Sequence, residues 1–284
     1  MKLYKYRKFS EFLIRELCAS EIYYSDPKQF NDPLDCSPIL IDDLPEHKIE
    51  DLCVKMLLKN VGKNEADSKI KSFRYYSTQY DSLEEQRKSY FYQLKQEIKS
   101  QLDNIMKNLG VLSLSGKCDS PLMWSHYADE HRGICLEFDM DGAVDTPCQI
   151  DYEGNRGIST KLIYDYIVNN SHTAHEQIQN QYFYTKAPEW KYESEWRLLS
   201  QSYGSHQIPF KLSGIYFGMR CDSWVVGSII KLLYSSSSNI SFYRIKPDQN
   251  SFALKDTELE PQEWIHSIPR PSARLAFGKV KVQS

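Results

Sequence analysis

The residue types best suited to catalysis lie near the end of the segment Lys186–Arg197. Glu193 and Glu195 are separated by one residue, so a strand that begins there places both carboxylates on the same side. Two like charges at close range raise the pKa of one group and leave the other available as a hydrogen-bond acceptor. We therefore take Glu195 and Glu193 as the first candidates for catalytic carboxylates.

Three aromatic rings surround these glutamates, at Trp190, Tyr192 and Trp196. Such a cluster is costly on a bare surface. Two interpretations stay open at this point. Either the rings belong to the core, with Glu195 neutralised by Arg132 or Arg197, or they line a pocket in which Trp190 contacts a ligand.

The opening residues supply a second candidate. The pattern Tyr4-Lys5-Tyr6-Arg7 predicts a strand with Tyr4 and Tyr6 on one face and Lys5 and Arg7 on the other. The planar guanidinium group of Arg7 is suited to holding a diphosphate, because it can donate two parallel hydrogen bonds. For Arg7 taken alone, an ordinary surface arginine is the simpler interpretation.

Two further segments carry polar groups that a core does not need. Asn31, Asp32 and Asp35 lie in a turn-forming loop that could keep its own shape, bind a cation or contact ligand hydroxyl groups. These groups are too few to specify a calcium or magnesium site, so a structural loop is favoured. His126, followed by Tyr127, suits hydrogen bonding or acid–base chemistry, and a buried histidine with satisfied hydrogen bonds fits equally well.

The sequence predicts no metal site. His126 and His131 are five residues apart and would point about 140° apart on a continuous helix, so they would not share a metal there. The seven cysteines are scattered, with no pair at zinc-ligand spacing. Reduced thiols of a cytoplasmic protein are the natural interpretation.

A framework of helices and strands must bring these segments together. The hydrophobic periodicity predicts a single α+β domain over residues 1–284, with a mixed β-sheet as its core. Residues 44–109 repeat apolar positions at intervals of three and four, which predicts an inserted lobe of three helices. Residues 261–284 are predicted to form a loosely packed tail. Other predicted elements are a helix capped by Ser10, a helix across Ser159–Tyr182, a strand across Glu193–Leu199 and a helix capped by Asp222.

Composition narrows the classes of partner. The net charge of −3 argues against a general nucleic-acid coat. No apolar run approaches the roughly 18–20 residues that span a bilayer, and the N-terminus does not resemble a secretory signal. We therefore expect a cytoplasmic protein with no membrane partner.

Taken together, these segments resemble a bacterial protein family of unknown function. The resemblance spans nearly the whole chain. It is carried by the segments Leu3–Arg7, Phe30–Asp35, Trp124–Asp139, Trp190–Arg197 and Tyr216–Gly218. The family supplies no activity.

A looser resemblance links the chain to ADP-ribosyltransferase folds, which are built around a split, strongly bent sheet. The arginine-type branch has an Arg on its first strand, a Ser on a later strand and a Glu-x-Glu, and Arg7, Ser25 and the pair Glu193 and Glu195 follow that order. The resemblance implies a bent or split sheet, NAD as a possible substrate and a toxin or phage-defence effector as the biological setting. The acceptor, a protein or a nucleic acid, is not specified.

The resemblance also implies roles. Glu195 would bind the ribose 2′-hydroxyl and stabilise an oxocarbenium-like state, as carboxylates do in glycoside hydrolysis, while Glu193 would orient the nucleophile. Arg7 would hold the diphosphate, and a tyrosine such as Tyr6 or Tyr127 would stack on the nicotinamide. On this interpretation Glu195→Gln stops turnover and leaves folding nearly intact.

Two other classes remain open on the sequence. A non-catalytic module would use the aromatic cluster to bind a small molecule, a nucleotide or a macromolecular partner. A metal-dependent hydrolase or nuclease would draw on Asp32, Asp35, His126 and Glu195.

Overall fold

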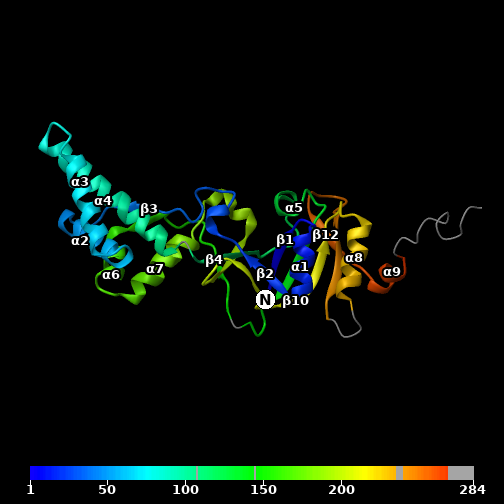
Figure 1. Ribbon diagram of the computed structural model, residues 1–284. Helices are drawn as coiled ribbons and strands as arrows, with labels where there is room; N and C mark the ends of the chain where they lie inside the picture. Colours follow the sequence, from blue (N-terminus) through cyan, green and yellow to red (C-terminus); the bar gives the residue numbers. More distant parts are fainter. Residues whose placement is uncertain (107, 144, 235–238, 268–284) are drawn as a thin grey trace, which may run out of the picture.

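An eight-stranded mixed sheet forms the centre of the protein (Figure 1). The computed structural model describes residues 1–106, 108–143, 145–234 and 239–267. Within this sheet, as described, one neighbouring pair of strands, Lys211–Phe217 with Ser241–Pro247, is parallel and the others are antiparallel, so the predicted α+β class with a mixed sheet is confirmed. In spatial order the strands are β12 (Leu254–Glu258), β11 (Ser241–Pro247), β10 (Lys211–Phe217), β5 (Ile134–Asp139), β1 (Lys2–Arg7), β4 (Gly110–Ser115), β8 (Glu195–Ser200) and β6 (Cys148–Gln149).

The sheet splits between β1 and β4. These strands pair only at Tyr4 and Ser115. Farther along β4, Val111 instead exchanges two backbone hydrogen bonds of 2.9 Å with Ser25, just after β2 (Glu21–Tyr24). Ser113 lies between the two positions at which β4 is paired, Ser115 with Tyr4 and Val111 with Ser25, so at Ser113 the edge of β4 has no strand partner among the described residues. The split sheet that the sequence predicts is therefore present.

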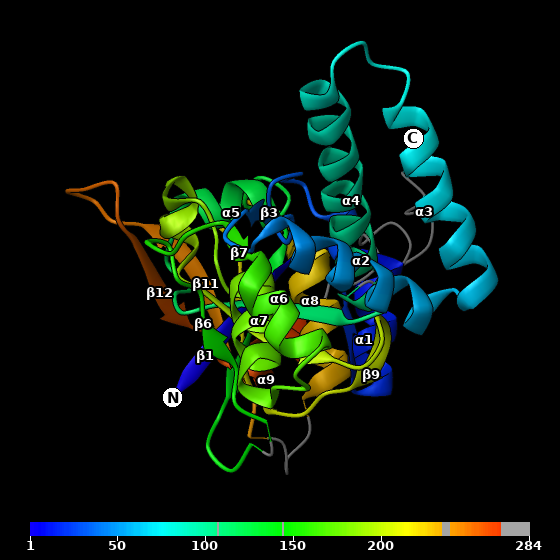
Figure 2. The ribbon, with the colours of Figure 1, turned by 90° about the vertical axis from the view of Figure 1, so that its left-hand side faces the viewer.

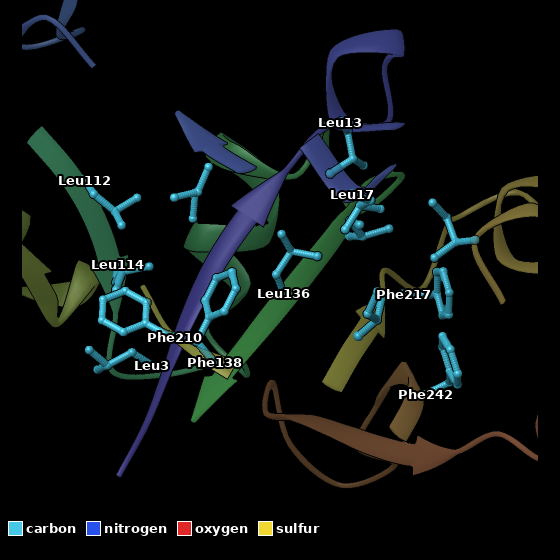
Figure 3. Packing of buried hydrophobic residues seen from close by; sticks show 14 of the residues in the cluster. Leu3, Leu13, Leu17, Leu112, Leu114, Leu136, Phe138, Phe210, Phe217 and Phe242 are labelled. Carbon is cyan, nitrogen blue, oxygen red and sulfur yellow. The ribbon is translucent and has the colours of Figure 1, made fainter. Parts of the chain in front are cut away.

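One face of the sheet is packed by α1 (Glu11–Ala19) and α8 (Ser223–Leu233). The predicted caps are confirmed, because the Ser10 and Asp222 side chains accept hydrogen bonds from the first turns. Figure 3 shows the side chains that fill this core. They include Leu3, Leu13, Leu17, Leu112, Leu114, Leu136, Phe138, Phe210, Phe217 and Phe242.

The opposite face carries α5 (Pro121–Tyr127). Tyr6, Trp124 and Cys135 pack together there, with the rings of Tyr6 and Trp124 edge to face at 5.2 Å. Tyr6 thus points away from Leu3 of the same strand, as the predicted alternation requires.

The helical lobe is larger than the periodicity of residues 44–109 indicates. That segment forms three helices as predicted, and α3 and α4 form a hairpin that projects beyond the others (Figure 2). Two later helices pack into the same hydrophobic cluster. The five are α2 (Glu46–Asn60), α3 (Lys63–Ser77), α4 (Leu83–Met106), α6 (Thr160–Ile167) and α7 (His172–Phe183).

The prediction of one helix across Ser159–Tyr182 is wrong. Asn170 has a left-handed φ of 52°, and Ser159 and Ser171 each cap a new helix. The chain therefore turns between α6 and α7, and the two helices lie against each other. Polar caps override the continuous apolar pattern at this point.

The strand predicted to begin at Glu193 begins at Glu195. The preceding residues form the 3₁₀ helix η2 (Pro188–Glu193), which ends at Ser194 with φ +45°. A proline at the start favours this tight turn.

The remaining elements are short. The segment predicted as a tail begins with α9 (Pro261–Ser267), whose Trp264 and Ile265 pack against the main core, and residues 268–284 lie outside the described part. All seven cysteines are free thiols. Among the described helices, none is both long and apolar enough to cross a bilayer. The small pairs are β2 with β9 (Gly204–Gln207) and β3 (Ile39–Ile41) with β7 (Gly157–Ser159), and a 3₁₀ turn η1 spans Pro27–Gln29.

Candidate functional site

The split in the sheet opens into a cleft of about 650 Å³, which we call the split-sheet cleft. Residues of α5 line it from one face of the sheet and residues of α1 from the other. This volume is within the range of small-molecule sites. The cleft is lined by polar, charged and aromatic side chains from several parts of the chain. They include Tyr6, Arg7, Lys5, Lys8 and Phe12 from the N-terminal segment, Ser25, Asn31 and Asp35 from the following loop, Ser113 of β4, His126 and Tyr127 of α5, and Lys186, Glu193, Glu195 and Arg197 near β8.

Arg197 lies at the centre of a buried ion-pair cluster. Its guanidinium group donates to Glu195 at 2.7 and 3.0 Å and to Asp35 at 2.9 and 2.6 Å. A further hydrogen bond of 2.7 Å reaches the carbonyl oxygen of Phe183 at the end of α7. The Arg197 side chain is 1% exposed, so these bonds replace all of its contact with water.

Lys186 extends this cluster into the cleft. Its ammonium group donates to Glu193 at 2.5 Å and to Glu195 at 2.9 Å, and lies 3.4 Å from Asp35. We call Asp35, Lys186, Glu193, Glu195 and Arg197 the Arg197 network. It holds three carboxylates and two cations.

The two glutamates experience opposite environments. Burial raises the pKa of Glu193, and the nearby charge of Glu195 adds to this effect. For Glu195 burial is outweighed by the charges of Arg197 and Lys186, which hold its pKa well below the usual range. The two carboxyl groups therefore differ in how readily they bind a proton, with Glu193 binding one more readily than Glu195.

Local backbone geometry brings both carboxylates to Lys186. The left-handed turn at Ser194 lies between the end of η2 and the start of β8. Glu193 and Glu195 thus meet at one cation, although they do not belong to one strand. The expectation that the pair faces one side is met through a turn rather than through strand alternation. Tyr127 of α5 completes the arrangement by donating to Glu193 at 2.6 Å.

Lys5 is a site residue that the sequence did not single out. Its ammonium group donates to the carbonyl oxygen of Ser113 at 2.6 Å, at the edge of β4 that the split leaves open. Among the described residues it forms no ion pair with a carboxylate. Burial and the positive charge of Arg7 together lower the pKa of Lys5 to about 7, against the pull of more distant glutamates. One signal in the sequence could have pointed to Lys5, because strand alternation places it on the same face as Arg7.

Arg7 lines the cleft but is already engaged. Its guanidinium group donates to Glu16 of α1 at 3.1 and 2.9 Å. Glu16 is 4% exposed and also accepts from the backbone of Tyr23. Arg7 is one-fifth exposed, so its outer edge remains open to a ligand.

The structure brings together most of the residues predicted for a ligand site. Tyr6, Ser25, Asn31 and Tyr127 line the split-sheet cleft. The Tyr6 hydroxyl group, however, donates to the carbonyl oxygen of Lys117, and its ring packs on Trp124. Tyr6 therefore serves as a wall rather than a free stacking surface.

Asp32 and Trp190 lie apart from the described cleft lining. The Asp32 carboxylate accepts from the backbone of Leu34 at 2.8 Å, a turn contact, and lines a separate cavity of about 340 Å³. The Lys186 ammonium group lies over the Trp190 ring, 5.0 Å from the ring centroid. The contribution of Trp190 is to shield that charge.

His126 lines the mouth of the cleft on α5. Its Nδ1 atom is 3.1 Å from the Tyr192 hydroxyl group, which fixes the ring on an exposed surface. The residues of the metal-hydrolase alternative do not converge, because Asp35 and Glu195 are bound to Arg197 while Asp32 faces the other cavity. In the described ranges no group of three or more metal-ligating side chains is placed to hold a metal ion.

Comparison with known protein families matches part of the chain. Residues 123–198 match the model of a family described as a protein of unknown function, DUF2971. The matched segment runs from α5 into β8 and includes His126, Lys186 and the glutamate pair. The prediction of a family of unknown function is confirmed for this segment. No curated protein and no solved structure matches the chain significantly.

Proposed function

We propose that the protein binds an anionic small molecule of nucleotide size in the split-sheet cleft. The observation that carries this proposal is Lys5, a lysine on the cleft wall whose partner in the described structure is a backbone carbonyl rather than a carboxylate. Arg7 and the exposed Lys8 lie on the same segment. A phosphate or carboxylate that enters the cleft meets positive charge that the protein has only partly neutralised.

NAD is the first ligand to test. It joins a diphosphate to two planar ring systems, and the cleft offers cations beside the rings of Phe12 and Tyr127. A ring face and a fixed cation are complementary to these two parts of a dinucleotide. The free thiols fit a reducing, cytoplasmic setting for this activity.

Binding is tested by thermal shift and calorimetry with NAD, ADP-ribose, ADP and nicotinamide. We expect the phosphorylated ligands to raise the melting temperature and nicotinamide alone to have no effect. Lys8→Glu reverses a charge at the cleft and should weaken binding about tenfold, because an anionic ligand then meets a carboxylate. Lys246→Glu, at an exposed position on β11, is the matched control. If no phosphorylated ligand binds at millimolar concentration, the proposal is wrong.

Glycosyl transfer from NAD is the second candidate. It is favoured by the opposite pKa shifts of Glu193 and Glu195, since two carboxyl groups with separated pKa values can act as acid or base and as fixed charge. The roles differ from those that the resemblance implies. The charge of Glu195 is already compensated by Arg197 and Lys186, so Glu193 becomes the group that acts on the ligand.

The assay for this candidate is nicotinamide release from NAD. Glu193→Gln keeps the size of the side chain and removes its exchangeable proton. We expect it to lower the rate by about two to four orders of magnitude while NAD still binds. A rate unchanged in Glu193→Gln would remove Glu193 from the mechanism, and NAD binding without turnover in the wild type would leave the binding function alone.

A further inference from the structure

Two of the lysines that line the split-sheet cleft, Lys186 and Lys5, have opposite chemistry. Lys186 contacts three carboxylates, which hold its pKa above the usual range despite burial. Lys5 contacts the carbonyl oxygen of Ser113. Lys186 therefore stays charged, whereas Lys5 has no carboxylate partner among the described contacts that would hold it in the charged form.

We propose that Lys5 is a nucleophile that forms an imine with an aldehyde or ketone whose phosphate or carboxylate group is held in the cleft. The inference deepens the proposed function and rests on its anionic ligand. It depends on a cavity large enough for the ligand, on the Lys5 amine at its wall and on the cations of Arg7 and Lys8 beside it.

Only an uncharged amine can attack a carbonyl carbon. The groups that act on Lys5 come from four elements: Arg7 on its own strand, Glu16 on α1, Glu193 at the end of η2 and Glu195 on β8. The glutamates favour the charged form, but burial and Arg7 outweigh them, and the pKa is about 7. Roughly half of the Lys5 amine is therefore uncharged at neutral pH, against well under 1% for an ordinary lysine.

The carboxylates near Lys5 are committed elsewhere. Glu16 is held by Arg7, and Glu195 by Arg197 and Lys186. Neither approaches the Lys5 ammonium group to ion-pair distance among the described contacts. An anionic ligand that binds beside Arg7 would bring its own carbonyl group to an amine that has no fixed charge partner.

The reaction balances with water as the by-product. The Lys5 nitrogen attacks the carbonyl carbon, a C–N bond forms, and the carbonyl oxygen takes up a proton. That proton comes from the Lys5 nitrogen. The resulting carbinolamine then loses its hydroxyl group, which breaks the C–O bond, and the second proton of the nitrogen leaves with it as water to give the neutral imine.

The test uses the full-length protein and pyridoxal 5′-phosphate, an aldehyde with a phosphate group. The imine is reduced with borohydride across a pH series, and the labelled lysine is located by peptide mass mapping. We expect labelling of Lys5 with a midpoint near pH 7, ahead of the other lysines by at least tenfold in rate at that pH. Pyridoxal, which lacks the phosphate, should label Lys5 more slowly because Arg7 and Lys8 then contribute nothing.

Variants separate chemistry from folding. Lys5→Arg keeps a cation but cannot form a stable imine, so the fast labelling should disappear, whereas Lys246→Arg should keep it. Circular dichroism and the melting temperature show whether each variant is folded, and Lys5→Met serves as a second variant if Lys5→Arg is not.

The outcomes distinguish this inference from the proposed function. If phosphorylated ligands bind and Lys5 is not labelled, or is labelled with the pH midpoint of the surface lysines, the imine is excluded and the binding function stands. If Lys5 is labelled by pyridoxal 5′-phosphate and no nucleotide binds, the imine stands and the nucleotide proposal fails. If pyridoxal labels Lys5 as fast as pyridoxal 5′-phosphate does, the ligand does not need an anionic group, and that part of the proposal is wrong.

Discussion

The guanidinium group of Arg197 donates two hydrogen bonds to Asp35, at 2.9 and 2.6 Å, although the residues lie 162 positions apart in the chain. Asp35 belongs to the loop before β3 and Arg197 to β8. The contact closes one side of the split-sheet cleft, because both residues line it. The wall of the candidate site is therefore also a tertiary link between the N-terminal segment and the sheet.

Arg197→Met should destabilise the protein by about 3–5 kcal/mol, because Asp35 and Glu195 would be left buried without their cation. The free energy of unfolding from urea denaturation measures this loss. The control is Arg132→Met, which breaks an exposed pair with Glu130 and should leave stability almost unchanged, because solvent screens that pair. Equal losses in the two variants would contradict a structural role for the Arg197 network.

Glu195→Gln should cost about 3 kcal/mol, since it removes the carboxylate that Arg197 and Lys186 share. This prediction differs from the expectation from the sequence, in which the substitution leaves folding nearly intact. Glu193→Gln should cost less, because Lys186 keeps Glu195 and Asp35 as partners and the amide can still accept from Tyr127. Urea denaturation of both variants at neutral pH compares the two costs.

Acid should erase the stabilising effect of Glu195. Its pKa is lowered on folding from the ordinary value of 4.5, so the unfolded chain binds the proton first. The stabilisation is complete above about pH 4.5 and is lost as the pH falls below it. The gap in unfolding free energy between the wild type and Glu195→Gln should therefore narrow below pH 4.5. A gap that stays constant would show that Glu195 does not titrate differently in the folded state.

Lys5→Met should change the pH dependence of stability at the alkaline side. The pKa of Lys5 falls on folding from 10.5 to about 7, so between these values the unfolded chain binds more protons. Lys5 then makes the wild type gain stability as the pH rises from 7 to 10.5, by up to about 1.4 kcal/mol per pH unit. The variant lacks this gain. Its unfolding free energy should therefore exceed that of the wild type at pH 7, and the difference should shrink as the pH rises. Chemical denaturation at pH 7, 8 and 9 measures the difference, and parallel curves would contradict the lowered pKa.

Gly133→Ala should disturb the end of β1 that carries Arg7. A Cβ atom at Gly133 would lie 2.2 Å from the carbonyl oxygen of Arg7 and 2.9 Å from that of Ala128. We expect a loss of about 1–3 kcal/mol from overpacking and weaker ligand binding. Gly116→Ala is the control, since its Cβ atom would approach no heavy atom closer than 3.4 Å. Melting temperature and ligand affinity, measured on both variants, separate the two positions.

The sequence predicts well those structural features that depend on residues close together in the chain. The alternation of Tyr4, Lys5, Tyr6 and Arg7 gives their two faces correctly, and Ser10 caps α1 as its side chain requires. The helices of residues 44–109 follow from apolar spacing. Strand alternation and side-chain caps are short-range effects, so a single sequence contains them.

The same local patterns mislead where polar side chains interrupt them. The apolar spacing across residues 159–182 suggests one helix, yet the serine caps and the left-handed Asn170 divide it. Its two halves then pack into the helical lobe with α2 and α4. The spacing of apolar residues within one segment does not show how that segment packs against a distant one.

By itself the sequence determined the α+β class, the faces of the opening strand, the N-caps of α1 and α8 and most of the segments that line the cleft. Only the tertiary structure decided what the charged residues of those segments do. It placed Arg7 on Glu16, Arg197 between Asp35 and Glu195, and Lys5 on a backbone carbonyl. The physical reason is that the pKa and reactivity of a charged group depend on burial and on charges within a few ångströms, and folding brings those neighbours from distant parts of the chain.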